Sequence, residues 1–305
     1  MVRDSLRLRL HQLRAALERR PRTLLIGCCG LVLSGGSMVW LGLYQQIDVS
    51  RQQPTLLELL DKVTSSTPKL VKDPSISQPP NPPRALNWQS PLAKQCSGLD
   101  QTVRKRLQGA QKSLRRRRQS IAIDPSNFGK RYSIDPWNNP INPLPRVVVL
   151  HETSYSLQSA LNTFQQFHAD ENDQVSYHTL IGRSGSVIDV VDPLYRAYGA
   201  GFSAFLGEWA VTNPEFMGSV NNFALHLSLE TPEDGHGGGQ KHSGYTAEQY
   251  DALALVLDEW MGRFAIKPEA ITTHQHVDLG GERGDPRSFD WAELQVRLAA
   301  LNRLC

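Results

Sequence analysis

The second half of the chain alternates between two rhythms of apolar residues. Short apolar or alternating runs, which predict buried strands, occupy residues 147–150, 177–181, 187–191, 224–229 and 271–273. Apolar residues at helical spacing predict amphipathic helices over residues 156–167, 246–264 and 289–304. The turn residues at 182–186 make the second and third strands a hairpin. Thr246 and Gln249 give the second helix a capping-box start. Strands alternating with helices predict an α/β domain with a central mixed β-sheet flanked by helices.

The first half of the chain begins with a long apolar stretch. Residues 23–44 hold no charged side chain, and a helix of that length can cross a hydrocarbon core. Three arginines stand within residues 19–22, whereas residues 48–62 are about neutral. The positive-inside rule then predicts a single-pass protein of the cytoplasmic membrane, with its N-terminus inside and its folded domain in the periplasm or cell envelope. A cleaved signal peptide is the alternative, although the stretch is long for one.

Charge and composition divide the chain further. We predict a basic cytoplasmic segment (1–22), a transmembrane anchor (23–44), a Pro-rich and basic stalk or linker (45–120), an extended lead-in (121–146) and a folded domain (147–305). The folded domain is acidic, with 21 acidic and nine basic side chains. Within the stalk, residues 98–120 predict a very basic helix. It either binds anionic wall polymer or lipid head groups, or it is solvated and contacts the acidic domain. We expect no nucleic-acid partner for a segment outside the membrane.

The chain has four cysteines. Cys28 and Cys29 lie in the apolar stretch, where small residues serve packing or lipidation. Cys96 and Cys305 would face an oxidising compartment, where they either form an intramolecular disulfide or remain two free thiols.

Three residues at strand ends and in a nearby loop can bind a metal ion. His151 directly follows the strand predicted at 147–150, and His274 directly follows the strand predicted at 271–273. Asp285 lies in a loop eleven residues after His274. Two imidazoles and one carboxylate, with a fourth position left for water, form a catalytic zinc arrangement. Spacing alone does not show that they meet, because long gaps are far less specific than paired CxxC motifs.

Residues 147–297 resemble the zinc-dependent N-acetylmuramoyl-L-alanine amidase family, which is related to phage lysozyme-type amidases and peptidoglycan recognition proteins. The resemblance is carried by Val-Leu-His151-Glu-Thr, by the hairpin from Val175 to Gly185, by the helix that begins at Thr246, and by the tail His274…Asp285-Pro…Phe289-Asp-Trp291. It implies that His151, His274 and Asp285 are zinc ligands. It also implies that Tyr177 occupies a position where some members carry an active-site tyrosine.

The sequence departs from the family pattern at three places. The catalytic glutamate of the family usually ends an apolar strand, which favours Glu230, whereas a gapless count from Asn221 places Ser228 there. A lysine often precedes the last ligand by two residues, and Arg283 stands in its place; an arginine can stabilise an oxyanion. The pocket motif Trp-His-Ala-Gly is replaced by Tyr-Gly-Ala-Gly, ending at Gly201, so its histidine is missing.

The resemblance implies a peptidoglycan hydrolase that cleaves the amide bond between N-acetylmuramic acid and L-alanine with zinc-activated water. Glu230, Arg283 and Tyr177 are the expected catalytic residues, and His178, Gly201 and Ser228 are expected to contact substrate. The predicted anchor favours a role at the wall over that of the cytoplasmic recycling amidases. A catalytically inactive peptidoglycan-binding module of the same fold is the alternative. We interpret His226 and His276 as structural, and residues 235–244 as a surface loop or a flap over the groove.

Overall fold

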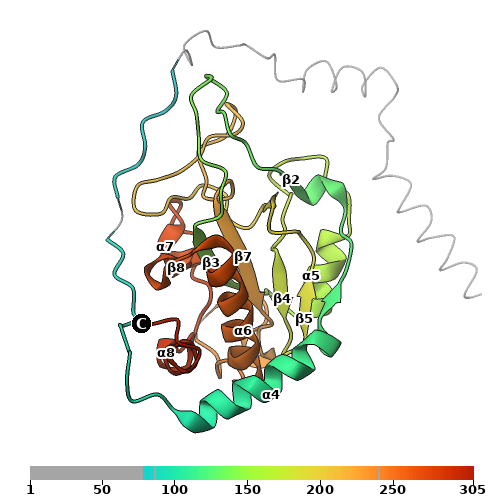
Figure 1. Cartoon of the computed structure of the whole chain (residues 1–305). Coiled ribbons are helices and arrows are strands. Elements are labelled where there is room, and N and C mark those ends of the chain that lie inside the picture. Colours follow the sequence, from blue (N-terminus) through green and yellow to red (C-terminus); the bar gives the residue numbers. More distant parts are fainter. Residues whose placement is uncertain (1–77, 86, 240) are drawn as a thin grey trace, which may run out of the picture. The chain divides into compact units, whose positions relative to one another are not determined.

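The computed structural model describes residues 78–305, except residues 86 and 240. A six-stranded sheet forms its centre, in the order β1-β5-β4-β7-β3-β8 (Figure 1). Its strands are β1 (Gln119–Ser120), β3 (Val147–Glu152), β4 (Thr179–Ile181), β5 (Val187–Asp189), β7 (Ala224–Leu229) and β8 (Ile271–Thr273). All neighbours run parallel except β4 and β5, which form the predicted hairpin. A second sheet pairs β2 (Phe128–Lys130) with β6 (Tyr195–Ala197) in antiparallel fashion.

Five α-helices accompany the sheets in the described part of the chain: α4 (Gln101–Arg117), α5 (Leu157–Phe164), α6 (Ala247–Phe264), α7 (His274–Val277) and α8 (Trp291–Ala300). The start of α6 forms because the hydroxyl of Thr246 accepts from the backbone N–H of Gln249 while the Gln249 side chain accepts from the N–H of Thr246. This reciprocal pair is the predicted capping box. The mixed α/β architecture predicted from the sequence is therefore confirmed.

The alternation of side chains along β3 and β7 separates two cores. Val148 and Leu150 of β3 lie in one cluster with Leu227 of β7 and with the buried residues of α6 and α8. Val147 and Val149 lie in the other cluster, on the opposite face of the sheet. Because β3 and β7 pair in register, His151 stands directly beside Ser228 on this second face. The apolar face under α6 and α8 thus supports the sheet, while the other face carries the polar side chains at the strand ends.

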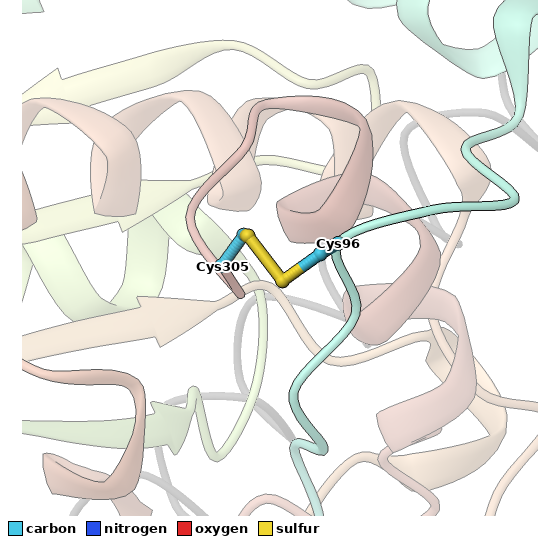
Figure 2. Close-up of a disulfide and its surroundings, with 2 residues drawn as sticks. All are labelled: Cys96 and Cys305. Carbon is cyan, nitrogen blue, oxygen red and sulfur yellow. A yellow bond between two sulfur atoms is a disulfide. The ribbon is translucent and has the colours of Figure 1, made fainter.

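The segment predicted as the end of the stalk packs against the domain. Helix α4 begins at Asp100, whose carboxylate accepts from the N–H groups of Thr102 and Val103. It contacts α6 and α8 through a buried apolar side. Cys96, just before α4, forms a disulfide with Cys305 at the end of the described chain (Figure 2). Of the two predicted outcomes for Cys96 and Cys305, a disulfide or two free thiols, the structure contains the disulfide.

The structure also corrects the predicted localisation. None of the helices in residues 78–305 is long and apolar enough to cross a membrane. The longest, α6, has 18 residues but includes charged side chains such as Asp251, Asp258 and Glu259. Residues 23–44, on which the predicted anchor rested, lie outside the described residues. The prediction of a membrane-anchored protein that faces the periplasm is contradicted by this finding, and we do not carry it further.

Candidate metal centre

Three elements bring the candidate ligands together at one edge of the sheet. His151 is the second-to-last residue of β3. His274 is the first residue of α7, which follows β8, the strand next to β3. Asp285 lies in the following loop, and its carbonyl oxygen accepts a hydrogen bond from the N–H of Gln275 at 3.1 Å. The loop is held in place because the carboxylate of Asp278 accepts from the N–H groups of Glu282 and Arg283. Parallel strands that end at the same edge thus bring together the residues singled out by the sequence.

The donor atoms of these residues form a small triangle. Nδ1 of His151 lies 3.1 Å from Nδ1 of His274 and 3.3 Å from Oδ2 of Asp285. The third side, from Nδ1 of His274 to Oδ2 of Asp285, measures 3.2 Å. In a tetrahedral zinc centre, bonds of about 2.0–2.1 Å place the ligand atoms roughly 3.3 Å apart. The spacing and chemistry of this donor set therefore fit a zinc ion with a fourth, open position.

The protonation states favour metal binding. Burial, with a further contribution from the neighbouring His274, lowers the pKa of His151 to about 4, so the imidazole is neutral at pH 7. Burial alone would raise the pKa of Asp285, but the adjacent imidazoles of His151 and His274 hold it well below its usual range. Metal ions bind neutral imidazoles and ionised carboxylates. His151 and Asp285 are thus in the required states near neutral pH.

A chain of histidines lies behind His151. Because Nδ1 of His151 faces the other ligands, its Nε2 carries the ring proton and donates to Nδ1 of His226 at 2.9 Å. The backbone N–H of His226 in turn donates to Nδ1 of His178, also at 2.9 Å. Hydrogen bonds from the outer nitrogen of a ligand histidine fix its tautomer and orientation. His226 therefore orients His151, and the sequence offered no periodicity or spacing that singled it out.

His178 is part of this buried structure and not of a substrate surface. Its Nδ1 is occupied as an acceptor, so Nε2 carries the proton and lies 3.2 Å from the carbonyl oxygen of Tyr195. Burial and the nearby Arg131 lower the pKa of His178 to about 3. The sequence predicts that His178 contacts substrate, whereas the structure places its side chain in this buried hydrogen-bond network.

The pocket motif that departs from the family pattern now has a physical explanation. A side chain at Gly199, the place of the missing histidine, would meet the ring of His226 at 2.4 Å. The ring of His226 thus fills the space where a side chain at residue 199 would lie. Gly201, two residues on, is exposed and lines the groove described below, and nothing lies within 4 Å of a Cβ placed there.

Tyr177 and Arg283 lie beside the candidate metal centre. The Tyr177 ring stacks on His151 with 4.5 Å between centroids and 26° between planes. Burial raises the pKa of its hydroxyl, with a further contribution from Asp285, so it remains a hydrogen-bond donor. Both Tyr177 and Arg283 line a groove of about 1460 Å³ together with His274 and Asp285. The predicted neighbours of the ligands are therefore found at the same groove.

The walls of this groove are large and mixed in character. Exposed rings and apolar side chains line it on one side, including Tyr132, Phe202, Phe216 and Met217. The glycines at 237–239 line it as well. Aromatic rings with polar tips suit sugars and peptides, which present both apolar and polar surfaces. The dimensions exceed those of a typical small-molecule pocket, which measures about 300–1,000 Å³.

Glu230 lies apart from this groove. Its carboxylate oxygens accept from the N–H of Leu157, at the start of α5, at 2.9 Å and from the N–H of Arg183 at 3.0 Å. It is not among the residues that line the groove. Ser228 stands beside His151 instead, fully buried, and its hydroxyl has no partner among the described residues. The structure therefore places Ser228 beside His151 and engages Glu230 in holding α5 and the β4–β5 turn.

A buried ion-pair network next to the ligands was not anticipated from the sequence. Glu152, which follows His151, lines the groove and accepts from Arg287 and from the hydroxyl of Tyr245. His242 contacts the same carboxylate through Nε2 at 2.9 Å. The side chain of His242 is fully buried. The segment interpreted as a surface loop or flap is thus fastened to the strand that carries His151.

Known proteins of one family resemble part of this chain. Residues 140–288 match the family model of N-acetylmuramoyl-L-alanine amidases. A 1,6-anhydro-N-acetylmuramyl-L-alanine amidase, AmpD of Citrobacter freundii, is 28% identical over 123 residues, which are 40% of this chain and 57% of the relative. AmpD of Enterobacter cloacae is 30% identical over 126 residues, or 41% and 57% of the two chains. The chain thus spans a little over half the length of these relatives. A crystal structure of a selenomethionine AmpD derivative aligns with a TM-score of 0.42 and 22% identity over 58% of this chain and 93% of that one.

Proposed function

Because residues 140–288 belong to the N-acetylmuramoyl-L-alanine amidase family, we propose that this protein hydrolyses the amide bond between N-acetylmuramic acid and L-alanine in peptidoglycan. The observation that carries the proposal is the triangle of His151, His274 and Asp285, of which His274 and Asp285 line the groove. The curated relatives carry the name of an amidase for this type of bond, which supports the same assignment.

The triangle would hold a zinc ion through the two Nδ1 atoms and the carboxylate of Asp285. Zinc in such a site supplies a Lewis acid for the scissile carbonyl and a water whose pKa is about 7. His226 would keep the Nδ1 atom of His151 directed at the metal, because it accepts the proton of the opposite ring nitrogen.

Two groove residues would act on the substrate itself. The cationic guanidinium of Arg283 would stabilise the negative charge that develops on the carbonyl oxygen. The Tyr177 hydroxyl, kept protonated by burial, would donate a hydrogen bond to the same oxygen or to the peptide. Gly201 would let the substrate approach the groove wall closely, since no side chain projects there.

We assign Glu230 a positioning role in place of the base. Both of its oxygens accept backbone N–H bonds at the start of α5 and in the β4–β5 turn. A general base must be within hydrogen-bond reach of the proton that it removes. The register favours a second candidate function, a module that binds peptidoglycan without cleaving it, because the residue of β7 that pairs with His151 is Ser228 and not a glutamate.

One experiment separates the two candidates. The full chain is incubated with intact peptidoglycan sacculi after zinc loading, after treatment with a chelator, and after zinc is restored. Mass spectrometry then looks for stem peptides with a free amino group on L-alanine. Release that depends on zinc would support the amidase. Sedimentation of the protein with the sacculi without release under any of these conditions would leave the binding module.

A further inference from the structure

Helix α4 carries a strong positive charge on the side that faces away from the domain. It contains seven basic residues and no acidic one. Its inner side is apolar, with Val103, Leu107 and Leu114 buried against α6 and α8. Because these two helices cover the sheet face opposite His151, α4 lies on the far side of the sheet from the candidate metal centre. In Figure 1, α4 runs along the lower outer edge of the domain.

Part of the charge of α4 serves to attach it. Arg106 pairs with Asp251 of α6 at 2.8 Å, and Arg117 donates to the carbonyl oxygen of Ser184. Arg118, just past the helix, pairs with Asp189 and Glu259. These contacts give Arg106, Arg117 and Arg118 a role in attaching α4 to the domain. They give no such role to the cations of α4 that point away from the domain.

The outward cations form one row. Lys105, Lys112 and Arg116 are seven and four residues apart, a spacing that aligns them on one face of a helix over about 16 Å. All three are exposed, and Arg104 and Arg115 widen this row to five cations. None of these five side chains forms an ion pair with any residue that the structure describes. We call these five residues the basic row.

Folding explains only part of the basic row: Arg115 and Arg116 lie in the last turn of α4, where cations favour the helix dipole, whereas Arg104, Lys105 and Lys112 do not. Like charges three or four residues apart, such as those of Lys112, Arg115 and Arg116, repel one another and weaken a helix. A pocket of about 360 Å³ lies at the end of the row. Arg115 and Arg263 both line it, so a second pair of like charges meets there. The two acids of this pocket are engaged: Asp258 pairs with Arg303, and Glu259 pairs with Arg118. The charge of the basic row is therefore not compensated by an ion pair with any residue that the structure describes.

The rest of the domain makes this surface distinctive. Residues 147–305 hold 21 acidic and nine basic side chains, so the domain as a whole repels anionic polymers. A local cationic face on such a domain orients it toward a polyanion. Disulfides are rare in proteins that share a compartment with nucleic acid, and the bond between Cys96 and Cys305 disfavours nucleic acid as the partner.

We propose that the basic row is a second attachment surface for intact peptidoglycan, whose stem peptides carry free carboxylates along the polymer. This inference rests on the proposed function and names its substrate class: the polymeric wall, in preference to a soluble fragment. A fragment bound in the groove cannot also reach the far side of the sheet, whereas a polymer network can. Two linked contacts with one polymer raise the effective concentration at each.

The test measures binding of the full chain to sacculi in the presence of a chelator, so that no turnover is needed. The triple variant Lys105→Glu, Lys112→Glu and Arg116→Glu is compared with a control that has the same charge change elsewhere: Arg84→Glu, Lys130→Glu and Lys267→Glu. We expect the first variant to lose about tenfold or more in affinity and the control to bind nearly as the natural protein does. Circular dichroism melting confirms that both variants are folded.

A second arm leaves the protein unchanged. Sacculi whose carboxylates have been converted to neutral amides should retain the natural protein about tenfold less than untreated sacculi do. Equal retention of the two triple variants, or equal retention on untreated and amidated sacculi, would overturn the proposal. If zinc-dependent hydrolysis is absent altogether, these binding results still decide the role of the basic row. If hydrolysis is present, the basic-row variant should still cleave a soluble muramyl peptide and should lose rate only on sacculi.

Discussion

The two faces of β3 and β7 have opposite chemistry although the strands pair residue by residue. On one face Val148, Leu150 and Leu227 join the apolar core under α6. On the other, His151, His226 and Ser228 are equally buried but polar. Burial alone therefore does not distinguish support from function in this domain. What distinguishes the second face is that its buried polar side chains lead to His274 and Asp285. Removing these polar groups from water costs free energy, which apolar side chains in a purely packing role would not cost.

The largest expected effect comes from removing a ligand on the polar face. Asp285→Ala removes the carboxylate that lies 3.2 Å from His274 and 3.3 Å from His151. We expect hydrolysis of sacculi to fall to the uncatalysed background, because the metal site loses its one charged ligand. The measurement is stem-peptide release by zinc-loaded protein. An active Asp285→Ala variant would contradict the ligand assignment.

A matching change on the apolar face should affect stability instead. Leu227→Ala removes a fully buried side chain and should lower the free energy of unfolding by about 2–5 kcal/mol. Chemical denaturation of the folded chain measures the loss, and zinc affinity should remain unchanged.

The neighbouring residue is the control for that variant. Ser228→Ala on the polar face removes a buried hydroxyl that has no partner among the described residues. We expect it to leave stability unchanged or to raise it by up to about 1 kcal/mol, because an unpaired hydroxyl is costly to bury. A large loss of stability would mean that Ser228 makes a contact on which the fold depends.

The polar face should also make the metal-free protein sensitive to acid. The pKa of His178 is lowered to about 3, against about 6.5 for an unfolded histidine. Between these values the unfolded chain binds a proton that the folded chain does not, so stability falls as the pH drops below about 6.5. The expected slope is about 1.4 kcal/mol per pH unit from this residue. Denaturation at several pH values should show a correspondingly shallower slope for His178→Asn, which keeps an acceptor and cannot titrate.

A subtler change on the polar face concerns His226. His226→Leu leaves the Nε2–H of His151 without its acceptor, which lies at 2.9 Å in the natural protein. We expect zinc affinity to fall by about 10–100-fold, as is typical for residues that orient a metal ligand. His226→Gln, which can still accept the hydrogen bond, should lose less. Equal losses in the two variants would show that volume and not the hydrogen bond matters; competition with a zinc chelator measures both.

The smallest effect on activity is expected at Glu230. If it anchors α5 and the β4–β5 turn, Glu230→Gln should keep activity within a few-fold, because the amide oxygen still accepts from the N–H of Leu157. Glu230→Ala should lower stability by about 1–3 kcal/mol, because two N–H groups lose their acceptor. Activity reduced to background in both variants, with stability unchanged, would instead identify Glu230 as the base.

Much of the fold was predictable because local patterns and tertiary structure agree. The alternation at 224–229 gives β7, and the capping box at Thr246 begins α6. The packing of α4 against α6 and α8 was harder to predict, because basic residues dominate its sequence and only three buried apolar side chains mark its inner side. The anchor predicted at 23–44 rested on length and hydropathy, and no described helix supports it.

The candidate site was predictable only as far as motif positions go. His151, His274 and Asp285 stand at strand ends and in the next loop, where topology brings them together. The contacts behind them were not predictable, because they join residues far apart in the sequence: His226 to His151, and His242 and Arg287 to Glu152. Glu230 and Ser228 differ by two residues on one strand, and only the structure distinguishes the residue beside His151 from the one that caps α5.

The most direct test of the account is the zinc stoichiometry of the polar face. Isothermal titration of the metal-free protein with zinc, repeated with His151→Ala, reports whether the buried triangle is a metal centre. We predict one tightly bound zinc ion per chain, which is lost in His151→Ala while Leu227→Ala still binds it. Absence of zinc binding, or equal binding by His151→Ala, would contradict the claim that the polar face is built around a metal.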